Sequence, residues 1–188
     1  MRVLVACEYS GRVRDAFRDR GHDAWSCDLL PCEADPEYHI QGDVLDIIND
    51  GWDMMIAHPT CTYLCNSGVC WLYKREGRWE QMREGALFFK KLLDAPIKKK
   101  CIENPIPHKY ALKIIGRKYD QIVQPHQFGH GETKATCFWL DELPPLLPTE
   151  IVQGREQRLH RLPPSPTRWK ERSRTFPGIA RAMAEQWG

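Results

Sequence analysis

Short, mostly apolar runs bounded by polar residues recur along the first two thirds of the chain. Their length of four or five residues is typical of buried strands, and they lie at Val3–Cys7, Ala24–Cys27 and Met54–Ala57. Two further short segments with a central pair of apolar residues, Lys100–Glu103 and Asp120–Gln124, are also expected to be strands. Between them lie segments with apolar residues at helical spacing, at Gly11–Arg20, Trp79–Leu93 and His108–Ile115. Strands that alternate with helices predict an α/β fold, with a mostly parallel sheet and helices on both faces.

The last third of the chain has a different pattern. Residues 143–166 hold six prolines, a density that predicts no regular element there. Arginine and lysine are frequent in this stretch and just beyond it, so we expect residues 143–174 to form a proline-rich basic insertion. Pro177–Trp187 predicts a closing helix, because proline suits the first helical turn and apolar residues then recur on one face.

Length and charge narrow the class of protein. A chain of 188 residues predicts a single domain, residues 1–188. Its 27 basic and 25 acidic side chains nearly cancel, so any contact with nucleic acid has to come from a local patch. No apolar run approaches the roughly 18–20 residues of a membrane helix, and the N-terminus does not resemble a signal peptide. We therefore expect a cytoplasmic protein, without membrane contact, whose eight cysteines are reduced.

Polar residues follow the predicted strands at several places. They lie at Glu8–Gly11, Asp28, Asp43, His58–Cys61 and Glu103–Pro105. Right-handed crossovers bring the carboxyl ends of parallel strands to one rim of the sheet, where such folds bind ligands. An acid at the end of the second strand suits a ribose hydroxyl pair, although turn formation explains Asp28 or Asp43 alone equally well.

Cys61 is the candidate nucleophile. It lies in a loop directly after a buried strand, two residues after Pro59, where a thiol can face a ligand. A buried structural thiol is the alternative. A metal site that includes His58 or the nearby Cys65 is not expected, because the cysteine spacings lack the two-residue separation of zinc knuckles.

Glu103 is the candidate acidic partner. A carboxylate seldom ends a buried strand unless it is paired or functional. Facing a pyrimidine, it can bond N3 and the exocyclic amine while a thiolate adds at C6. A simple turn at Asn104 and Pro105 is the alternative.

Taken together and in order, these segments resemble the cytosine-5 DNA methyltransferase family, in particular small methyltransferase-like proteins of phages. The resemblance spans nearly the whole chain and rests on Val3–Gly11, Gly21–Asp28, Gly42–Val44, Asp53–Cys61, Glu103–Pro105, Thr133–Thr136 and Arg172–Ala184. It implies a Rossmann-like fold, S-adenosylmethionine as methyl donor, and a DNA substrate, duplex or single-stranded, in a bacterial or phage-infected host cell.

The resemblance also implies roles for individual residues. Cys61 adds to C6 of cytosine, Glu103 binds N3 and the amine, and Lys134 replaces an arginine that anchors the base or the cysteine loop. Cofactor contacts are implied for Cys7, Glu8, Tyr9, Ser10, Gly11, Asp28, Leu29, Asp43, Val44, His58 and Pro59. Substrate contacts are expected for Pro59, Thr60, Asn104, Thr133, Arg168, Arg172 and Arg174.

The chain departs from the family in three ways. Glu8 and Ser10 replace glycines of the first loop, Thr60 replaces the proline before the cysteine, and only residues 143–174 stand where a large target-recognition domain is usual. A short loop can contact phosphates and give loose context preference. Two alternatives therefore stay open, an enzyme that modifies C5 of a free pyrimidine nucleotide and a catalytically inactive homologue that binds nucleic acid. The oligomeric state is not predicted.

Overall fold

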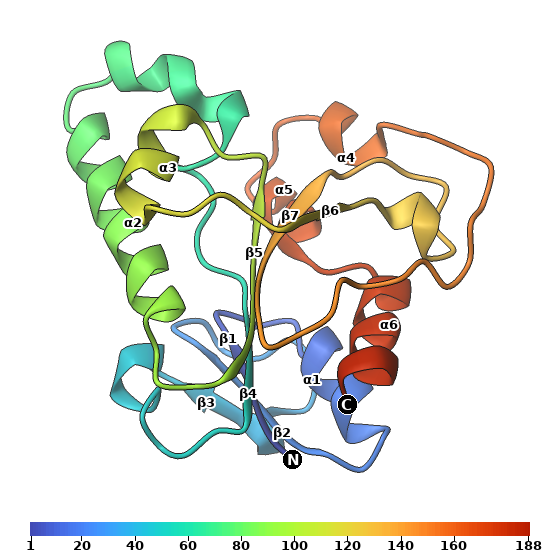
Figure 1. The fold of residues 1–188 in the computed structure, drawn as a ribbon. Coiled ribbons are helices and arrows are strands. Elements are labelled where there is room, and N and C mark those ends of the chain that lie inside the picture. Colours follow the sequence, from blue (N-terminus) through green and yellow to red (C-terminus); the bar gives the residue numbers. More distant parts are fainter.

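The apolar runs form the centre of one seven-stranded sheet in the computed structural model, which describes residues 1–188 (Figure 1). The strands are β1 (Arg2–Ala6), β2 (Asp23–Asp28), β3 (His39–Gln41), β4 (Met54–Ala57), β5 (Lys99–Pro105), β6 (Gln121–Val123) and β7 (Thr136–Asp141). Their order across the sheet is β3-β2-β1-β4-β5-β7-β6. The most apolar runs, in β1 and β4, lie side by side near the middle.

The predicted parallel sheet is confirmed for its larger part. β1 pairs in parallel with β2 and β4, β2 with β3, and β4 with β5. This order is that of a Rossmann-like sheet. The direction changes at β7, which lies antiparallel between β5 and β6.

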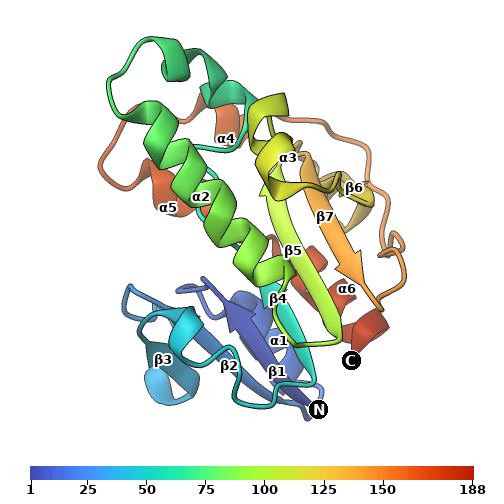
Figure 2. The same ribbon diagram turned by 60° about the vertical axis from the view of Figure 1, so that its left-hand side comes forward.

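Helices cover both faces of the sheet, as predicted (Figures 1 and 2). α1 (Arg12–Arg18) and α6 (Pro177–Trp187) pack against one face, and α2 (Arg78–Leu93) and α3 (Lys109–Ile115) against the other. Alternate residues of each strand serve the two cores. Val3 and Val5 belong to the core under α1 and α6, whereas Leu4 belongs to the core under α2 and α3.

The strand predicted at Lys100–Glu103 ends later than expected. β5 continues through Asn104 and Pro105, because every residue of β7 pairs with it, Cys137 with Asn104 and Thr136 with Pro105. β7 itself was not predicted, nor was β3, a three-residue strand with a single apolar residue. Glu103 therefore lies inside a strand, not after one.

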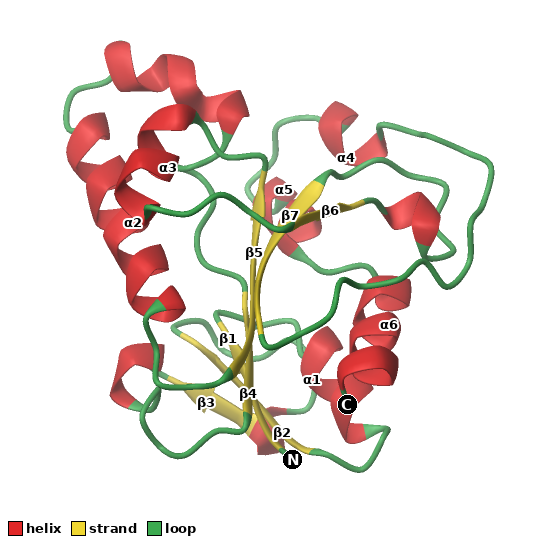
Figure 3. Cartoon of the chain, viewed as in Figure 1, coloured by secondary structure: helices red, strands yellow, loops and turns green.

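The prediction of no regular element in residues 143–166 was wrong at one place. α4 (Arg158–Arg161) is a single helical turn that fits between the two groups of prolines and buries Leu159. α5 (Arg168–Ser173) follows it, and the rest of the stretch runs as loop (Figure 3). None of the helices combines the length and the apolar character that crossing a membrane requires.

Candidate active site

A cavity of about 830 Å³ opens at the carboxyl ends of the central strands. This volume is in the usual range of small-molecule sites. Its wall includes residues from the loops after β1, β2 and β4, from β5, from the loop before β7 and from α5. Fourteen residues singled out from the sequence line it: Cys7, Glu8, Tyr9, Ser10, Asp28, His58, Pro59, Thr60, Cys61, Glu103, Thr133, Lys134, Arg172 and Arg174.

Cys61 and Glu103 line this same cavity, although 42 residues separate them in the sequence. β4 and β5 are parallel neighbours, and Ala57 at the end of β4 lies opposite Ile102. His58 follows Ala57 and Glu103 follows Ile102, so these two residues lie side by side at the same level of the sheet. The loop from His58 then carries Cys61 over the strand ends.

His58 and Glu103 form a buried pair at the base of the cavity. The His58 Nδ1 and Glu103 Oε2 atoms are 3.5 Å apart, and only 8% and 11% of the two side chains are exposed. Burial by itself lowers the pKa of His58, but the Glu103 carboxylate outweighs it and the pKa lies above its ordinary value. Burial likewise raises the pKa of Glu103, and His58 with Lys134 brings it below its ordinary value. Glu103 is therefore ionised at neutral pH.

The Cys61 thiol is protonated in the ligand-free protein at neutral pH. Burial raises its pKa to about 11, and the nearby Cys65 and Glu103 act in the same direction. Lys134 opposes them and lowers the pKa. A thiolate here consequently forms only in a small fraction of molecules until something removes the proton or adds positive charge.

Lys134 is held at the cavity wall by two contacts. Its backbone N–H donates to the Gln124 Oε1 atom at 3.0 Å, and its Nζ donates to the Arg174 carbonyl at 3.2 Å. From this position its charge acts on Cys61, Glu103 and His58 alike. It is the lysine or arginine whose charge acts on both the candidate nucleophile and the candidate acid.

The first loop is organised by Glu8. Its carboxylate accepts hydrogen bonds from the backbone N–H groups of Val13 and Arg14, at 2.8 and 3.2 Å, and so caps α1. The Tyr9 hydroxyl bonds to the Ser173 hydroxyl at 2.8 Å, which ties this loop to α5. Glu8 and Tyr9, both predicted to contact the cofactor, therefore also hold the first loop in place through bonds within the chain. Asp28 lies at the end of β2, where its carboxylate accepts a hydrogen bond from the Leu30 N–H.

Six of the residues singled out from the sequence do not line the cavity: Gly11, Leu29, Asp43, Val44, Asn104 and Arg168. Leu29 is 72% exposed, and Asp43 accepts from the Leu45 N–H to begin a 3-10 turn. Asn104 is buried in β5 and donates to the Pro105 carbonyl. The structure therefore places Asp28, but not Asp43, where a ligand in this cavity can reach it.

The arginines of the basic insertion are mostly engaged within the chain. The Arg174 guanidinium donates to both carboxylate oxygens of Glu33, at 2.9 and 3.0 Å, and Arg168 donates to the His160 carbonyl. Arg172 is exposed at the cavity and makes no hydrogen bond or ion pair with the rest of the chain. Of the three, Arg172 is the one that lines the cavity with a guanidinium that has no partner within the chain.

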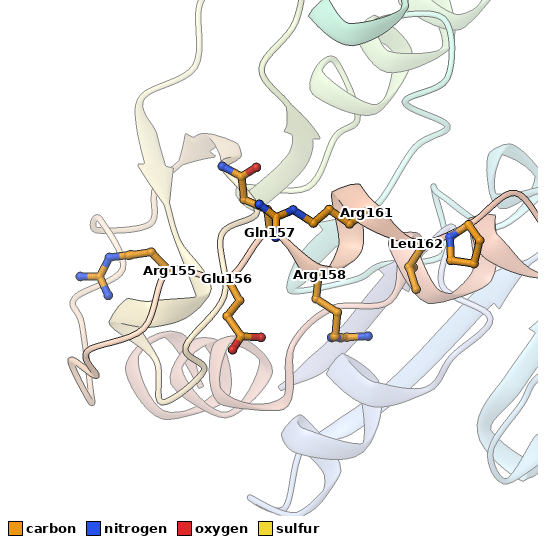
Figure 4. A pocket seen from close by; sticks show the side chains of 7 residues that line it. Arg155, Glu156, Gln157, Arg158, Arg161 and Leu162 are labelled. Carbon is orange, nitrogen blue, oxygen red and sulfur yellow. The ribbon is translucent and has the colours of Figure 1, made fainter.

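A second, more open depression lies around α4 (Figure 4). Its guanidinium groups do not converge, since Arg155 points away from Arg158 and Arg161. Arg155 donates to carbonyls of its own loop, and Arg158 pairs with Glu132. We infer no ligand site here. Nor do histidine, cysteine and carboxylate side chains gather anywhere into a group of three that could bind a metal.

Comparisons with known proteins identify the fold. No family model matches the sequence, and no curated protein sequence matches it. Among solved structures, a proposed DNA modification methyltransferase encoded within a prophage (E. coli) superposes with a TM-score of 0.53 at 15% identity, over 81% of this chain and 52% of that one. The Entamoeba histolytica methyltransferase EhMeth gives 0.49 at 16% identity, over 84% and 57%. The chain shares the fold of the prophage protein. It spans about half the length of the solved structures it matches.

Of the cavity residues that were not predicted, the three with the largest side chains are Arg78, Trp71 and Trp169. Arg78 is buried at the start of α2, donates to the Thr62 carbonyl at 2.8 Å and lies 4.3 Å from the Tyr63 ring centre, so it holds the cysteine loop. Trp71 and Trp169 stand at the cavity while remaining 39% and 48% exposed. Nothing in their local sequence distinguishes them from tryptophans of the core, because only the tertiary structure decides which rings stay exposed.

Proposed function

We propose that this chain is an S-adenosylmethionine-dependent methyltransferase that modifies C5 of cytosine in DNA through a covalent bond to Cys61. The observation that carries the proposal is the convergence of Cys61, Glu103 and Lys134 on one cavity at the strand carboxyl ends. The fold shared with a proposed DNA modification methyltransferase supports the same class of reaction.

The cavity suits the donor in its chemistry. A carboxylate at the end of the second strand is the group that binds ribose hydroxyls in Rossmann-like folds, and Asp28 lies there on the cavity wall. The backbone of the first loop, from Cys7 to Ser10, lines the cavity beside it. Asp28 and this loop would hold the donor, which when bound supplies an electrophilic methyl group.

The chain's own residues account for the activation of the base. Addition of the Cys61 thiolate to C6 places negative charge on the ring, at N3 and C5. A proton carried by the buried His58–Glu103 pair and passed through the Glu103 carboxylate to N3 would neutralise this charge. Once C5 has taken the methyl group, loss of the C5 proton to a base and elimination of Cys61 from C6 would restore the aromatic ring and return the free thiolate. The Lys134 charge lowers the pKa of Cys61 and so favours the attacking thiolate.

The deciding experiment is nucleoside mass spectrometry of cytosine-containing DNA treated with the protein and isotopically labelled S-adenosylmethionine. We expect labelled 5-methylcytosine from the wild type and none from Cys61→Ser, with donor binding by calorimetry equal in both. Cys70→Ser is the matched control, because Cys70 is an exposed thiol outside the cavity. Equal methylation by Cys61→Ser would refute the nucleophile, and label on another ring atom would refute the C5 assignment.

One observation favours a second candidate, C5 modification of a free pyrimidine nucleotide. With Arg174 and Arg168 engaged inside the chain, the cavity offers the free guanidinium of Arg172, which is enough for one phosphate group. Parallel reactions with dCMP and with DNA separate the two substrates. Failure of calorimetry to detect donor binding would instead support a non-enzymatic binding protein.

A further inference from the structure

Two exposed tryptophans stand at the cavity, on segments far apart in the sequence. Trp71 belongs to the 3-10 segment Asn66–Tyr73, which follows the cysteine loop, and Trp169 belongs to α5. They are 39% and 48% exposed, whereas Trp52, Trp139 and Trp187 are buried. Large exposed aromatic rings are costly to leave in water, and at a binding site they provide stacking surfaces.

Each of these rings is accompanied by cations. The Arg75 guanidinium lies 4.4 Å from the centre of the Trp71 ring, with the Lys74 ammonium at 5.9 Å. On the other segment, the Lys170 ammonium lies 5.7 Å from the centre of the Trp169 ring. An aromatic ring beside a lysine or arginine suits a nucleotide, since the ring takes the base and the cation takes its phosphate.

The charge at these two segments differs from that of the whole chain. Near Trp71 the chain carries two basic residues, Lys74 and Arg75, and one acid, Glu76. Near Trp169 it carries Lys170 and Arg172 and one acid, Glu171. Arg174 adds a fifth cation and is paired with Glu171 and with a third acid, Glu33, which also lies 3.9 Å from the Lys170 ammonium. A local excess of positive charge therefore lies beside the cavity of a chain whose basic and acidic residues nearly cancel, and it complements a phosphate backbone.

We propose that Trp71 and Trp169 form an aromatic clamp that stacks on the nucleotides flanking the target cytosine, and that the substrate it selects is single-stranded DNA. The inference rests on the proposed function, because it takes the base to enter the cavity that holds Cys61. A cytosine that reaches this partly buried thiol has to leave its stack. The two rings take the place of the departed cytosine beside the flanking bases, and unstacking costs least in a single strand.

The test measures binding by fluorescence anisotropy of a labelled single-stranded oligonucleotide with one central cytosine, and of the same sequence as duplex, at fixed salt. We expect tighter binding of the single strand. Trp71→Ala and Trp169→Ala should each weaken that binding by about 5- to 150-fold, the range of one lost stacking contact. Trp71→Phe and Trp169→Phe should retain most of it, which also separates stacking from a general loss of fold.

Trp79→Ala is the matched control. Trp79 is 37% exposed but lies outside the cavity, against Tyr73 and Tyr110. Its removal should leave the affinity unchanged. An equal loss in this variant, or duplex binding as tight as that of the single strand, would overturn the clamp.

The same proteins separate the clamp from the reaction. If the protein methylates duplex DNA or dCMP and neither tryptophan variant changes that rate or single-strand affinity, the clamp is refuted and the proposed function stands. If single strands bind through both rings but no labelled 5-methylcytosine forms, the clamp stands and the proposed function is refuted.

Discussion

The reactivity of Cys61 towards an alkylating reagent can be worked out from its surroundings. With a pKa of about 11, roughly one Cys61 in a thousand is a thiolate at pH 8. An ordinary thiol, with a pKa of about 8.5, is about one quarter ionised at the same pH. The more basic thiolate is about tenfold more nucleophilic, which offsets part of the difference. We expect Cys61 to react with iodoacetamide about 20-fold more slowly than an ordinary thiol, before any steric hindrance.

The assay is timed labelling followed by peptide mass spectrometry between pH 7 and 10. The reference is the same peptide in urea-unfolded protein, which removes differences between cysteine-containing peptides. In the folded protein the rate should rise about tenfold per pH unit across the whole range. In the unfolded protein it should level off above the ordinary thiol pKa of about 8.5.

Lys134 supplies a second arm of the experiment. Lys134→Met removes the cation that lowers the pKa of Cys61, so labelling at pH 8 should become slower still, whereas Lys134→Arg keeps the charge and serves as control. Labelling of folded Cys61 as fast as in urea at pH 8, or a rate that levels off near pH 8.5, would refute the reasoning. It would show a thiol already activated in the ligand-free protein.

Three other substitutions test the site and the packing. Asp28→Ala should weaken S-adenosylmethionine binding about tenfold or more by calorimetry, and an unchanged affinity would remove Asp28 from the donor site. Glu103→Gln should slow methyl transfer at least about 100-fold. The same variant should also have a lower free energy of unfolding in urea than the wild type, and this difference should be largest between about pH 4.3 and 6.5. The lowered pKa of Glu103 stabilises the fold above the ordinary carboxyl pKa, and this is lost as pH falls through the folded value. The raised pKa of His58 stabilises it below the ordinary imidazole pKa, and this is lost as pH rises through the folded value. If the loss of unfolding free energy in Glu103→Gln did not depend on pH, His58 and Glu103 would not form an ion pair. Gly178→Ala should lower stability by about 1–3 kcal/mol in thermal melts, because the new Cβ would lie 1.9 Å from the Phe128 carbonyl oxygen. An unchanged Tm would show that α6 can shift.

Local patterns determined the architecture. Short apolar runs and helical spacing predicted four of the five parallel strands, all but β3, and the helices α1, α2 and α3, because one buried stripe or run suffices to define each of these elements. The common location of Cys61 and Glu103 also followed from the sequence. Parallel strands run in one direction, so their carboxyl ends lie at one rim of the sheet. Residues at those ends can therefore be expected to lie close together before their contacts are known.

The tertiary structure decided what depends on partners distant in the chain. β7 inserts antiparallel beside β5 and thereby draws Glu103 into a strand. Arg174, expected at the substrate, pairs with Glu33, which is 141 residues away. The protonated state of Cys61 likewise results from burial and from neighbouring charges on several loops. A sequence records which groups a chain carries, but desolvation and charge pairing act between groups that only the folded chain brings together.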